Sequence, residues 1–405
     1  MTINNEHKKL NVPNLRFPEF QGEWKKTTIG DIADLYKGTG ISKDQLSDDG
    51  EPCILYGELY TKYKSETIRE VISKTNIDNT KLVRSKANDV IIPCSGETAE
   101  DIATARCVLN GNILLGGDLN IIRLHGYDGA FMSYQLNGRR KYDIAKVAQG
   151  VSVVHLYGEH LKGVKTINPC LEEQKKIAKL LSLLDERIAT QNKIIEDLKK
   201  LKSAIIENVF DDKHSERLQL DNVGSYIRGL TYSSNDVVEH GGTLVMRSNN
   251  IVNGSLLDYN NNVVFVNKQM SAEQQLQNGD VVICMANGSS SLVGKSSFYD
   301  GSCHSPITVG AFCGIYRSKE PIVKWLFQTN KYRRYIWNSL QGGNGAIANL
   351  NGEDILNMSF SIPSAPIKDT CVKMLTSVDS ALENNISLCA LYTLQKQYLL
   401  RQMFI

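Results

Sequence analysis

A chain of 405 residues exceeds what one hydrophobic core usually serves, so we expect two or three domains. Its hydrophobic fraction of 41% and charged fraction of 22% are typical of a folded globular protein and exclude an intrinsically disordered one. The formal net charge of +2 gives no global signature of nucleic-acid binding, so a surface that neutralises phosphates would have to be local.

The sequence predicts a cytoplasmic protein. Its first residues, MTINNEHKKLNVPN, are polar and lack the apolar stretch of a secretory signal, and no apolar run reaches the roughly 20 residues that span a bilayer. The nine cysteines are scattered, odd in number and without a Cys-x-x-Cys pair, which favours reduced, structural thiols. Cys303-His304 is the only adjacent Cys-His pair, and without a second pair we expect no zinc site.

Residues 27–155 are predicted to form an α+β domain. Short β-rich runs such as 90–92 are bounded by Gly, Asn and Asp, as strands usually are. A helix is expected over residues 131–148, shortly before a much longer one.

The longer helix follows Pro169. Apolar residues from Ile177 to Val209 recur in alternating steps of four and three, the seam of a coiled coil with a period of about 3.5 residues. Two polar residues, Gln191 and Lys202, interrupt the seam. At about 1.5 Å per residue this helix would be roughly 60 Å long. The polar segment 211–216 is expected to turn the chain into the next domain.

The remaining chain repeats the same plan. Adding 194 to residues 177–185 gives 371–379 in the same register. A second α+β region (220–349) contains the β-rich runs 263–266 and 281–283 and a predicted helix over 323–340. A second seam runs from 371 to 403, and Asn385 and Lys396 interrupt it at the equivalent positions. A period this long indicates a duplicated domain and not a solenoid.

We predict that the two long helices pair as an antiparallel coiled coil. Matched seams with matched polar interruptions would fix the register, and equivalent halves usually associate about a two-fold axis. The alternative is two unrelated amphipathic helices, each lying on its own domain. The predicted fold class is therefore α+β, a tandem duplication with globular domains at 1–160 and 213–354, each followed by a long helix, at 161–212 and 355–405.

The sequence contains no complete motif of a known catalytic or nucleotide-binding site among those considered. The segment GSSSLVGKS (288–296) has five residues where a phosphate-binding loop has four between its glycine and Gly-Lys-Ser, and the residues after it do not favour the helix that such a loop needs. Gly38-Thr39-Gly40 lacks the third glycine of a dinucleotide fingerprint. There is no Gly-x-Ser-x-Gly, His-Glu-x-x-His or Asn-Pro-Pro-aromatic motif. We therefore expect a protein that binds and does not catalyse.

Paired arginines and polar–aromatic loops predict a DNA-binding surface. Arg139-Arg140 and Arg333-Arg334 occupy equivalent places in the repeat and suit phosphate contacts, although arginine pairs on a helix often serve only solubility. Loops near Tyr56 and near Arg247 mix side chains that read base edges. The predicted DNA-binding set is Tyr36, Lys37, Tyr56, Glu58, Tyr60, Lys62, Lys64, Ser95, Arg106, Arg139, Arg140, Gln149, Ser152, Arg228, Tyr232, Arg247, Asn249, Asn250, Asn287, Ser289, Lys295, Arg333, Arg334, Gln341 and Asn344, with no catalytic and no metal-binding residue.

The sequence resembles the specificity subunits of type I restriction-modification enzymes. RFPEFQGEW (16–24) followed by TTIGDIADLYKG is similar to the opening of many such subunits, as is EEQKKIAKLLSLLDERI (172–188), which recurs in divergent form in the second repeat. Two variable domains, each followed by a similar long helix, make a layout specific to that family. The second helix departs from the first, beginning APIKDTC where the first has LEEQKKI.

The resemblance implies that each α+β domain is a target-recognition domain that reads one half of an interrupted DNA site. The paired helices would act as a fixed spacer. Two methyltransferase subunits would dock on the chain and methylate adenine with S-adenosylmethionine, and restriction subunits would add ATP- and Mg-dependent translocation and cleavage. The chain itself would bind no cofactor.

Two other interpretations remain open from the sequence. The duplicated domains could form a non-catalytic scaffold that binds protein or carbohydrate. An enzyme with an unrecognised site, such as a nuclease, is the second. The resemblance does not give the DNA target, the spacer length or the individual base contacts.

Overall fold

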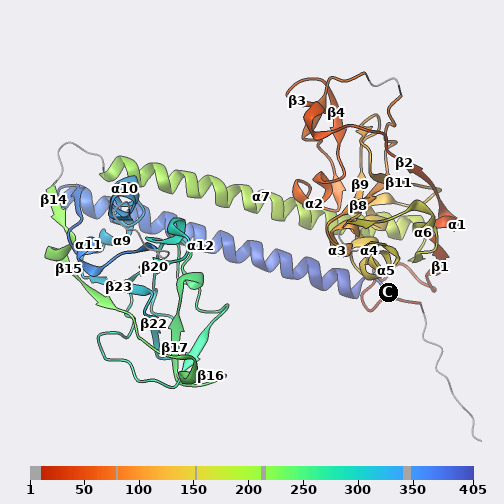
Figure 1. The fold of residues 1–405 in the computed structure, drawn as a ribbon. Coiled ribbons are helices and arrows are strands. Elements are labelled where there is room, and N and C mark those ends of the chain that lie inside the picture. Colours follow the sequence, from red (N-terminus) through yellow and green to blue (C-terminus); the bar gives the residue numbers. More distant parts are fainter. Residues whose placement is uncertain (1–10, 79–80, 151–152, 211–215, 341–347) are drawn as a thin grey trace, which may run out of the picture. The chain divides into compact units, whose positions relative to one another are not determined.

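The computed structural model describes residues 11–78, 81–150, 153–210, 216–340 and 348–405. The chain divides into two units, each built from segments far apart in the sequence. Unit 1 consists of Met1–Asn192 and Ser387–Ile405, and unit 2 consists of Lys193–Ile386. Each unit therefore holds one globular body and one half of each of the two long helices (Figure 1).

Unit 1 is built on two main sheets. The first has the strand order β2-β11-β7-β9-β5 and the second the order β10-β4-β6-β3, in which β10 and β4 are parallel. Two-stranded ladders join β1 to β13 and β8 to β12. The strands are β1 Lys25–Thr28, β2 Ala33–Lys37, β3 Leu46–Ser47, β4 Glu51–Ile54, β5 Thr67–Ile68, β6 Ser73–Thr75, β7 Asp89–Pro93, β8 Ser95–Gly96, β9 Arg106–Val108, β10 Leu114–Leu115, β11 Leu119–Leu124, β12 Val154–His155 and β13 Lys165–Asn168.

Unit 2 repeats this topology, except that in the described residues its first sheet has four strands where that of unit 1 has five. Its sheets have the orders β15-β23-β19-β21 and β16-β18-β17-β22, with β17 and β22 parallel, and its ladders join β14 to β25 and β20 to β24. The strands are β14 Glu216–Gln219, β15 Gly224–Arg228, β16 Val237–Val238, β17 Thr243–Met246, β18 Val264–Val266, β19 Val281–Cys284, β20 Ala286–Asn287, β21 Ser296–Phe298, β22 Ile307–Val309, β23 Cys313–Ser318, β24 Ala348–Asn349 and β25 Ser359–Ile362.

An ion pair at equivalent places identifies the two bodies as copies. Arg123 forms two hydrogen bonds with the buried Asp89, at 2.9 and 2.7 Å. In unit 2, Arg317 does the same with the buried Asp280, at 2.8 and 2.6 Å. Each pair joins the ends of two adjacent central strands, β7 with β11 and β19 with β23. The predicted tandem α+β duplication is confirmed.

Short helices close the sheets. In unit 1 they are α1 Ile29–Ile32, η1 Lys43–Gln45, α2 Glu58–Thr61, α3 Ala99–Ile102, α4 Gly129–Asn137, α5 Lys141–Val147 and α6 Gly158–Lys162. In unit 2 they are α8 Leu220–Val223, η2 Ser234–Asp236, η3 Ser248–Asn250, η4 Ser290–Leu292, α9 Val323–Leu326, α10 Asn330–Leu340 and α11 Gly352–Leu356.

Each helix predicted ahead of a long one is in fact two. In unit 1 the predicted helix over 131–148 ends at Gly138, which leaves helical backbone angles and separates α4 from α5. In unit 2 the break between α9 and α10 falls at Thr329, whose side chain bonds the Leu326 carbonyl and accepts from the Tyr332 amide. These local caps satisfy the polar groups of the helix ends and so stop each helix.

The two long helices are α7 (Leu171–Phe210) and α12 (Ala365–Gln402). In unit 1 the first half of α7 packs against the second half of α12, with Leu181 and Leu184 in one core cluster with Leu399 and Met403. In unit 2 the second half of α7 packs against the first half of α12, where Ile206 and Leu375 share a core. Within each unit the two helices run antiparallel, as predicted (Figure 1). In the described residues no helix is long and apolar enough to cross a membrane.

Candidate nucleic-acid interface

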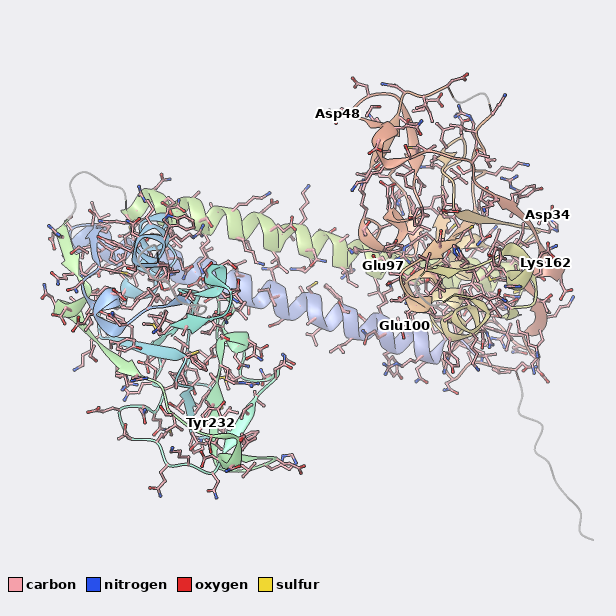
Figure 2. The ribbon with its side chains drawn as sticks, viewed as in Figure 1. Asp34, Asp48, Glu97, Glu100, Lys162 and Tyr232 are labelled. Carbon is pink, nitrogen blue, oxygen red and sulfur yellow. The ribbon has the colours of Figure 1, made fainter. Side chains whose placement is uncertain are left out.

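A cavity of about 450 Å³ in unit 2 collects three of the predicted DNA-binding residues. Tyr232, Arg247 and Asn249 line it together with Phe312. Figure 2 shows Tyr232 in the part of unit 2 that lies away from the long helices, in the region of β16 and β17. The cavity therefore combines a cation, an amide and two aromatic rings, which are the side chains suited to base edges.

A buried asparagine shapes this cavity. Strand β17 ends at Met246, and the Oδ1 atom of Asn250 accepts a 3.0 Å hydrogen bond from the Arg247 amide. The Nδ2 atom of Asn250 donates to the carbonyls of Asp258 and Asn261, at 3.0 and 2.8 Å. Because these bonds hold the turn, Arg247 and Asn249 are left exposed to solvent.

Arg247 and Phe312 present most of their side chains to the outside. Among the described residues, the Arg247 guanidinium donates one long hydrogen bond, 3.3 Å, to the Asn262 carbonyl. Phe312 is 66% exposed, while its carbonyl accepts hydrogen bonds from the amides of Met285 and Ala286. An arginine with unused donors beside an exposed ring can contact both the polar edge and the methyl group of a base.

A second cavity, of about 550 Å³, lies across a short loop from the first. Its lining includes Ser291, Lys295, Arg333 and Trp337, and Trp337 is 67% exposed. The segment after β19 runs from one cavity to the other. At its start, Asn287 donates to Ser248, which lines the first cavity (3.3 Å). Further along, Ser291 lines the second cavity, and its hydroxyl lies 2.8 Å from that of Ser289.

The charge of this combined surface is positive. Arg247, Lys295 and Arg333 contribute cations, and the described lining of both cavities includes no Asp or Glu. Phosphate oxygens are stabilised by such cations, and the absence of neighbouring carboxylates in these linings avoids repulsion. The residues that line these two cavities, which include Tyr232, Arg247, Phe312, Arg333 and Trp337, are called the unit 2 face below.

The corresponding loop of unit 1 is acidic, whereas residues 286–292 of unit 2 carry no charged side chain. Residues 95–101 follow β7, and residues 286–292 follow β19, the equivalent strand of unit 2. The unit 1 segment contains Glu97 and Glu100 (Figure 2). Burial raises the pKa of the nearby Tyr60, and Tyr56 and the carboxyl groups of Asp101 and Glu97 add to the shift. The two copies of the domain therefore present different chemistry at the same place in the fold.

The arginine dyads also differ between the copies. Arg139 donates to the carbonyl of Arg401 (2.7 Å), and Arg140 donates to the carbonyl of Ile405 (3.1 Å) and contacts Asp143 at 3.3 Å. These cations therefore lie at the C-terminal end of α12, where the helix dipole favours positive charge. Arg333 instead lines the second cavity of unit 2, and its neighbour Arg334 is exposed.

Several predicted residues lie in the interior. Glu58 is buried and bonds both Lys62 (2.6 Å) and Ser73, and Asn250 is the buried turn residue described above. Arg106 is buried and donates to the carbonyls of Tyr63 and Ala105. Ser95 is buried as well. In this structure these side chains hold the body together and are not presented at its surface.

The other predicted residues are dispersed. In unit 1, Tyr36 stacks under the guanidinium of Arg123, Lys37 lies 4.0 Å from Asp118, and Tyr56, Lys64 and Gln149 are exposed. In unit 2, Arg228 and Ser289 are exposed. The predictions at Ser152, Gln341 and Asn344 lie outside the described residues.

Sequence reasoning missed Phe312 and Trp337. Phe312 lies in a glycine-containing turn between two strands, where an aromatic residue is a usable signal for a binding surface. Trp337 follows the arginine dyad by one helical turn, at 333 and 337, so the helix period already places it beside Arg333.

The described residues hold no group of three or more His, Cys, Asp or Glu side chains able to bind a metal ion. The loop of GSSSLVGKS contains the 3-10 turn η4 and continues at Ser296 as strand β21, so no helix N-terminus follows its lysine. The segment therefore lacks the element that holds phosphate in a nucleotide-binding loop.

Comparison with known proteins gives consistent matches. A family described as the type I restriction modification DNA specificity domain matches residues 21–200. The MjaVIII type I restriction enzyme specificity subunit of Methanocaldococcus jannaschii is 29% identical over 197 residues, covering 48% of this chain and 43% of that protein. The EcoKI specificity subunit of Escherichia coli is 34% identical over 155 residues, covering 36% of this chain and 31% of that protein. The matches thus span less than half the length of either relative.

A solved structure resembles the whole chain. The type I restriction-modification S subunit from M. genitalium aligns with a TM-score of 0.67 at 17% identity, covering 97% of this chain and 99% of that one. At this identity the likeness shows the shared fold alone.

Proposed function

We propose, since the chain belongs to the family of type I restriction-modification specificity subunits, that it recognises DNA sequence for such a system and is not itself a catalyst. Residues 1–160 and 213–354 would be the two recognition domains, and the helices at 161–212 and 355–405 the spacer between them. The description of the matching family supports DNA recognition, and the duplicated fold supports a target read in two parts.

The unit 2 face is the observation that carries the proposal. Two adjacent cavities combine three cations, an amide and exposed aromatic rings, with no carboxylate in their described lining. Arg247 can donate two hydrogen bonds to a guanine, Asn249 can pair with an adenine, and Phe312 can contact a thymine methyl. Lys295 and Arg333 would hold the flanking phosphates, which position the domain without reading sequence.

The two domains would read different half-sites. The same loop is acidic in unit 1 and rich in serine in unit 2, so one scaffold offers two different recognition surfaces. In unit 1 the exposed side chains of Tyr36 and Tyr56 are the candidates for base contacts. Arg139 and Arg140 donate hydrogen bonds at the end of α12. They would then support DNA binding by stabilising unit 1 and not by contacting phosphates.

The partners and cofactors follow from the proposed family role. Two methyltransferase subunits would dock on this chain and modify adenine with S-adenosylmethionine, and restriction subunits would use ATP and Mg. This chain would bind double-stranded DNA and no cofactor of its own. The proposed location is the cytoplasm, where such a complex meets cellular DNA.

The decisive experiment is methylation-sensitive sequencing of DNA from cells that express this chain with a methyltransferase subunit of its own system. We expect modified adenines in a two-part motif with a fixed gap, appearing only when this chain is present. Cells that express the methyltransferase subunit alone are the control. No new methylation, although both subunits associate, would refute DNA recognition and favour a scaffold that binds protein or carbohydrate.

The salt dependence of DNA affinity, measured on the purified chain or complex, also distinguishes DNA recognition from a scaffold that binds protein or carbohydrate. Binding dominated by phosphate contacts falls steeply between about 50 and 200 mM salt, because condensed counterions are released from the DNA. An affinity for DNA that does not change over this range would contradict the proposed role of Lys295 and Arg333.

A further inference from the structure

Both long helices bury a lysine in their seam, and each lysine meets an aspartate of the other helix. In unit 1, Lys396 of α12 lies 2.5 Å from Asp185 of α7. In unit 2, Lys202 of α7 lies 2.7 Å from Asp379 of α12. Asp185 and Asp379 are equivalent positions of the repeat, as are Lys202 and Lys396. The side chains of Lys202 and Asp379 are only 8% and 6% exposed.

Each aspartate is also held by an aromatic donor from the globular body of its own unit. The hydroxyl of Tyr134, on α4, donates to Asp185 at 2.6 Å. The indole Nε1 of Trp325, on α9, donates to Asp379 at 3.0 Å. One carboxylate therefore joins three elements in each unit, the two long helices and the body. We call these the unit 1 junction and the unit 2 junction.

Further charges complete each junction. In unit 1, Lys396 also contacts the buried Glu66 at 2.5 Å, and Ser65 donates to Asp185 at 2.9 Å. Burial raises the pKa of Glu66; although burial acts the other way on Lys396, the charges of Glu66 and Asp185 raise the pKa of that lysine. In unit 2, Lys324 of the body lies 3.3 Å from Asp379.

A buried charge network of this kind restricts the relative orientation of the elements that it joins. Apolar side chains tolerate small rotations and shifts, since the hydrophobic effect has no direction. A buried ion pair is compensated only when its partners keep close contact, and removing one partner leaves an uncompensated charge in the interior. The junctions therefore hold each body at one orientation on its helix pair.

The Tyr232 end of the unit 2 face lies far from the unit 2 junction. The second cavity lies closer to it, since Lys202 also donates to the Gly254 carbonyl (2.7 Å), next to the lining residue Asn253. Figure 2 shows Tyr232 in the part of the body that is distant from the long helices, whereas Asp379 belongs to α12. A small rotation about the junction therefore moves the side chains at the Tyr232 end of the face by more than it moves the junction itself. A fixed distance between two half-sites requires that this rotation be suppressed.

We propose that Asp185 with Lys396, and Asp379 with Lys202, are positioning residues. They would determine how far the number of base pairs between the two half-sites can depart from its preferred value before recognition is lost. They would act without touching DNA, by fixing the angle between each body and its helix pair. This inference rests on the proposed function, because it presupposes a target read in two parts.

The test uses the chain together with its methyltransferase subunits and a DNA library in which both half-sites are constant and the gap varies by single base pairs. The variants are Asp185→Asn and Asp379→Asn, and Tyr134→Phe is a milder change that removes only one donor to Asp185. The matched control is Glu186→Gln, because Glu186 forms an exposed ion pair with Arg69 (2.6 Å) between the same helix and the same body.

We expect Asp185→Asn and Asp379→Asn to raise the ratio of methylation at wrong gaps to methylation at the correct gap by about tenfold, which corresponds to about 1.4 kcal/mol. Tyr134→Phe should raise this ratio by less, and Glu186→Gln should leave it unchanged. The preferred bases within each half-site should stay the same in all four variants.

Two results would overturn the inference. In the first, the wild type methylates a fixed-gap motif and the ratio is unchanged in Tyr134→Phe and in every folded Asp variant. In the second, the ratio stays constant while methylation at all gaps falls together, which is the result of a merely structural role. A wild type that directs no two-part methylation would instead refute the proposed function, and the inference with it.

Discussion

Single side chains decide what the unit 2 face can recognise. Arg247 is exposed because the buried Asn250 holds the turn behind it. Arg247 is therefore the candidate contact with DNA, and Asn250 keeps the turn in shape. The sequence identified both as candidate contacts, since amide and basic residues in a loop look alike before the chain folds. Burial separates them, and the burial of Asn250 depends on how the following loop folds back, because its amide donates to the carbonyls of Asp258 and Asn261.

Replacing Arg247 with Ala should change base preference at one position of one half-site. Loss of a bidentate contact with guanine costs about 1–3 kcal/mol of discrimination against the wrong base. Methylation sequencing of the variant complex would show a relaxed position in the motif. Lys200→Ala is the control, because Lys200 is an exposed cation on α7. A motif identical to that of the wild type would remove Arg247 from the recognition surface.

The interior residues mark the limit of prediction at this scale. Arg106 has the composition of a DNA contact, yet its guanidinium bonds the Tyr63 carbonyl inside unit 1. Phe312 and Trp337 show the opposite error, since large aromatic residues are expected inside and these two are mostly exposed. A one-dimensional pattern does not tell which face of a turn reaches solvent.

Among the elements, the long helices were the most predictable. Their steps of four and three extend over many turns, and the observed bounds of α7 and α12 follow the predicted seams. Lys202 and Lys396 appeared in the sequence only as interruptions. Their partners, Asp185 and Asp379, lie on the other helix, so the ion pairs become visible only when the two helices are placed together.

A core substitution in α12 tests the packing of unit 2. Leu375 is fully buried, so Leu375→Ala should lower the free energy of unfolding by about 2–5 kcal/mol through lost transfer energy and a new cavity. The adjacent Met374 is exposed, and Met374→Ala should change stability by no more than about 0.5 kcal/mol. Urea midpoints followed by circular dichroism measure both changes. Equal midpoints would show that α12 does not pack through Leu375.

At the scale of the whole chain, the duplication was read from the sequence because the register holds over the long helices. The sheets confirm it in detail, down to the equivalent pairs of Asp89 with Arg123 and Asp280 with Arg317. The acidic residues of one loop and the serines of the other are visible in the sequence. That the loop of unit 2 borders a cavity could not be predicted. It depends on which loop residues the fold brings together.

Exchange of residues 1–155 for those of another family member should alter one half-site of the motif and leave the other unchanged. Each body has its own sheets and cores, so its recognition surface does not depend on the sequence of the other. Sequencing of methylated DNA from cells with the chimeric chain gives the result. Changes in both half-sites would show that the two domains do not read independently.

The division of the chain also sets an order for its folding during synthesis. Residues 387–405 belong to unit 1, where Phe404 and Leu399 share a core with Trp24 and Phe131. All of Lys193–Ile386 must be translated before these residues leave the ribosome. At about 5–20 residues per second this delay is roughly 10–40 seconds. Throughout that interval the nascent N-terminal body exposes an unfilled apolar surface, so the part of the protein that is made first is completed last.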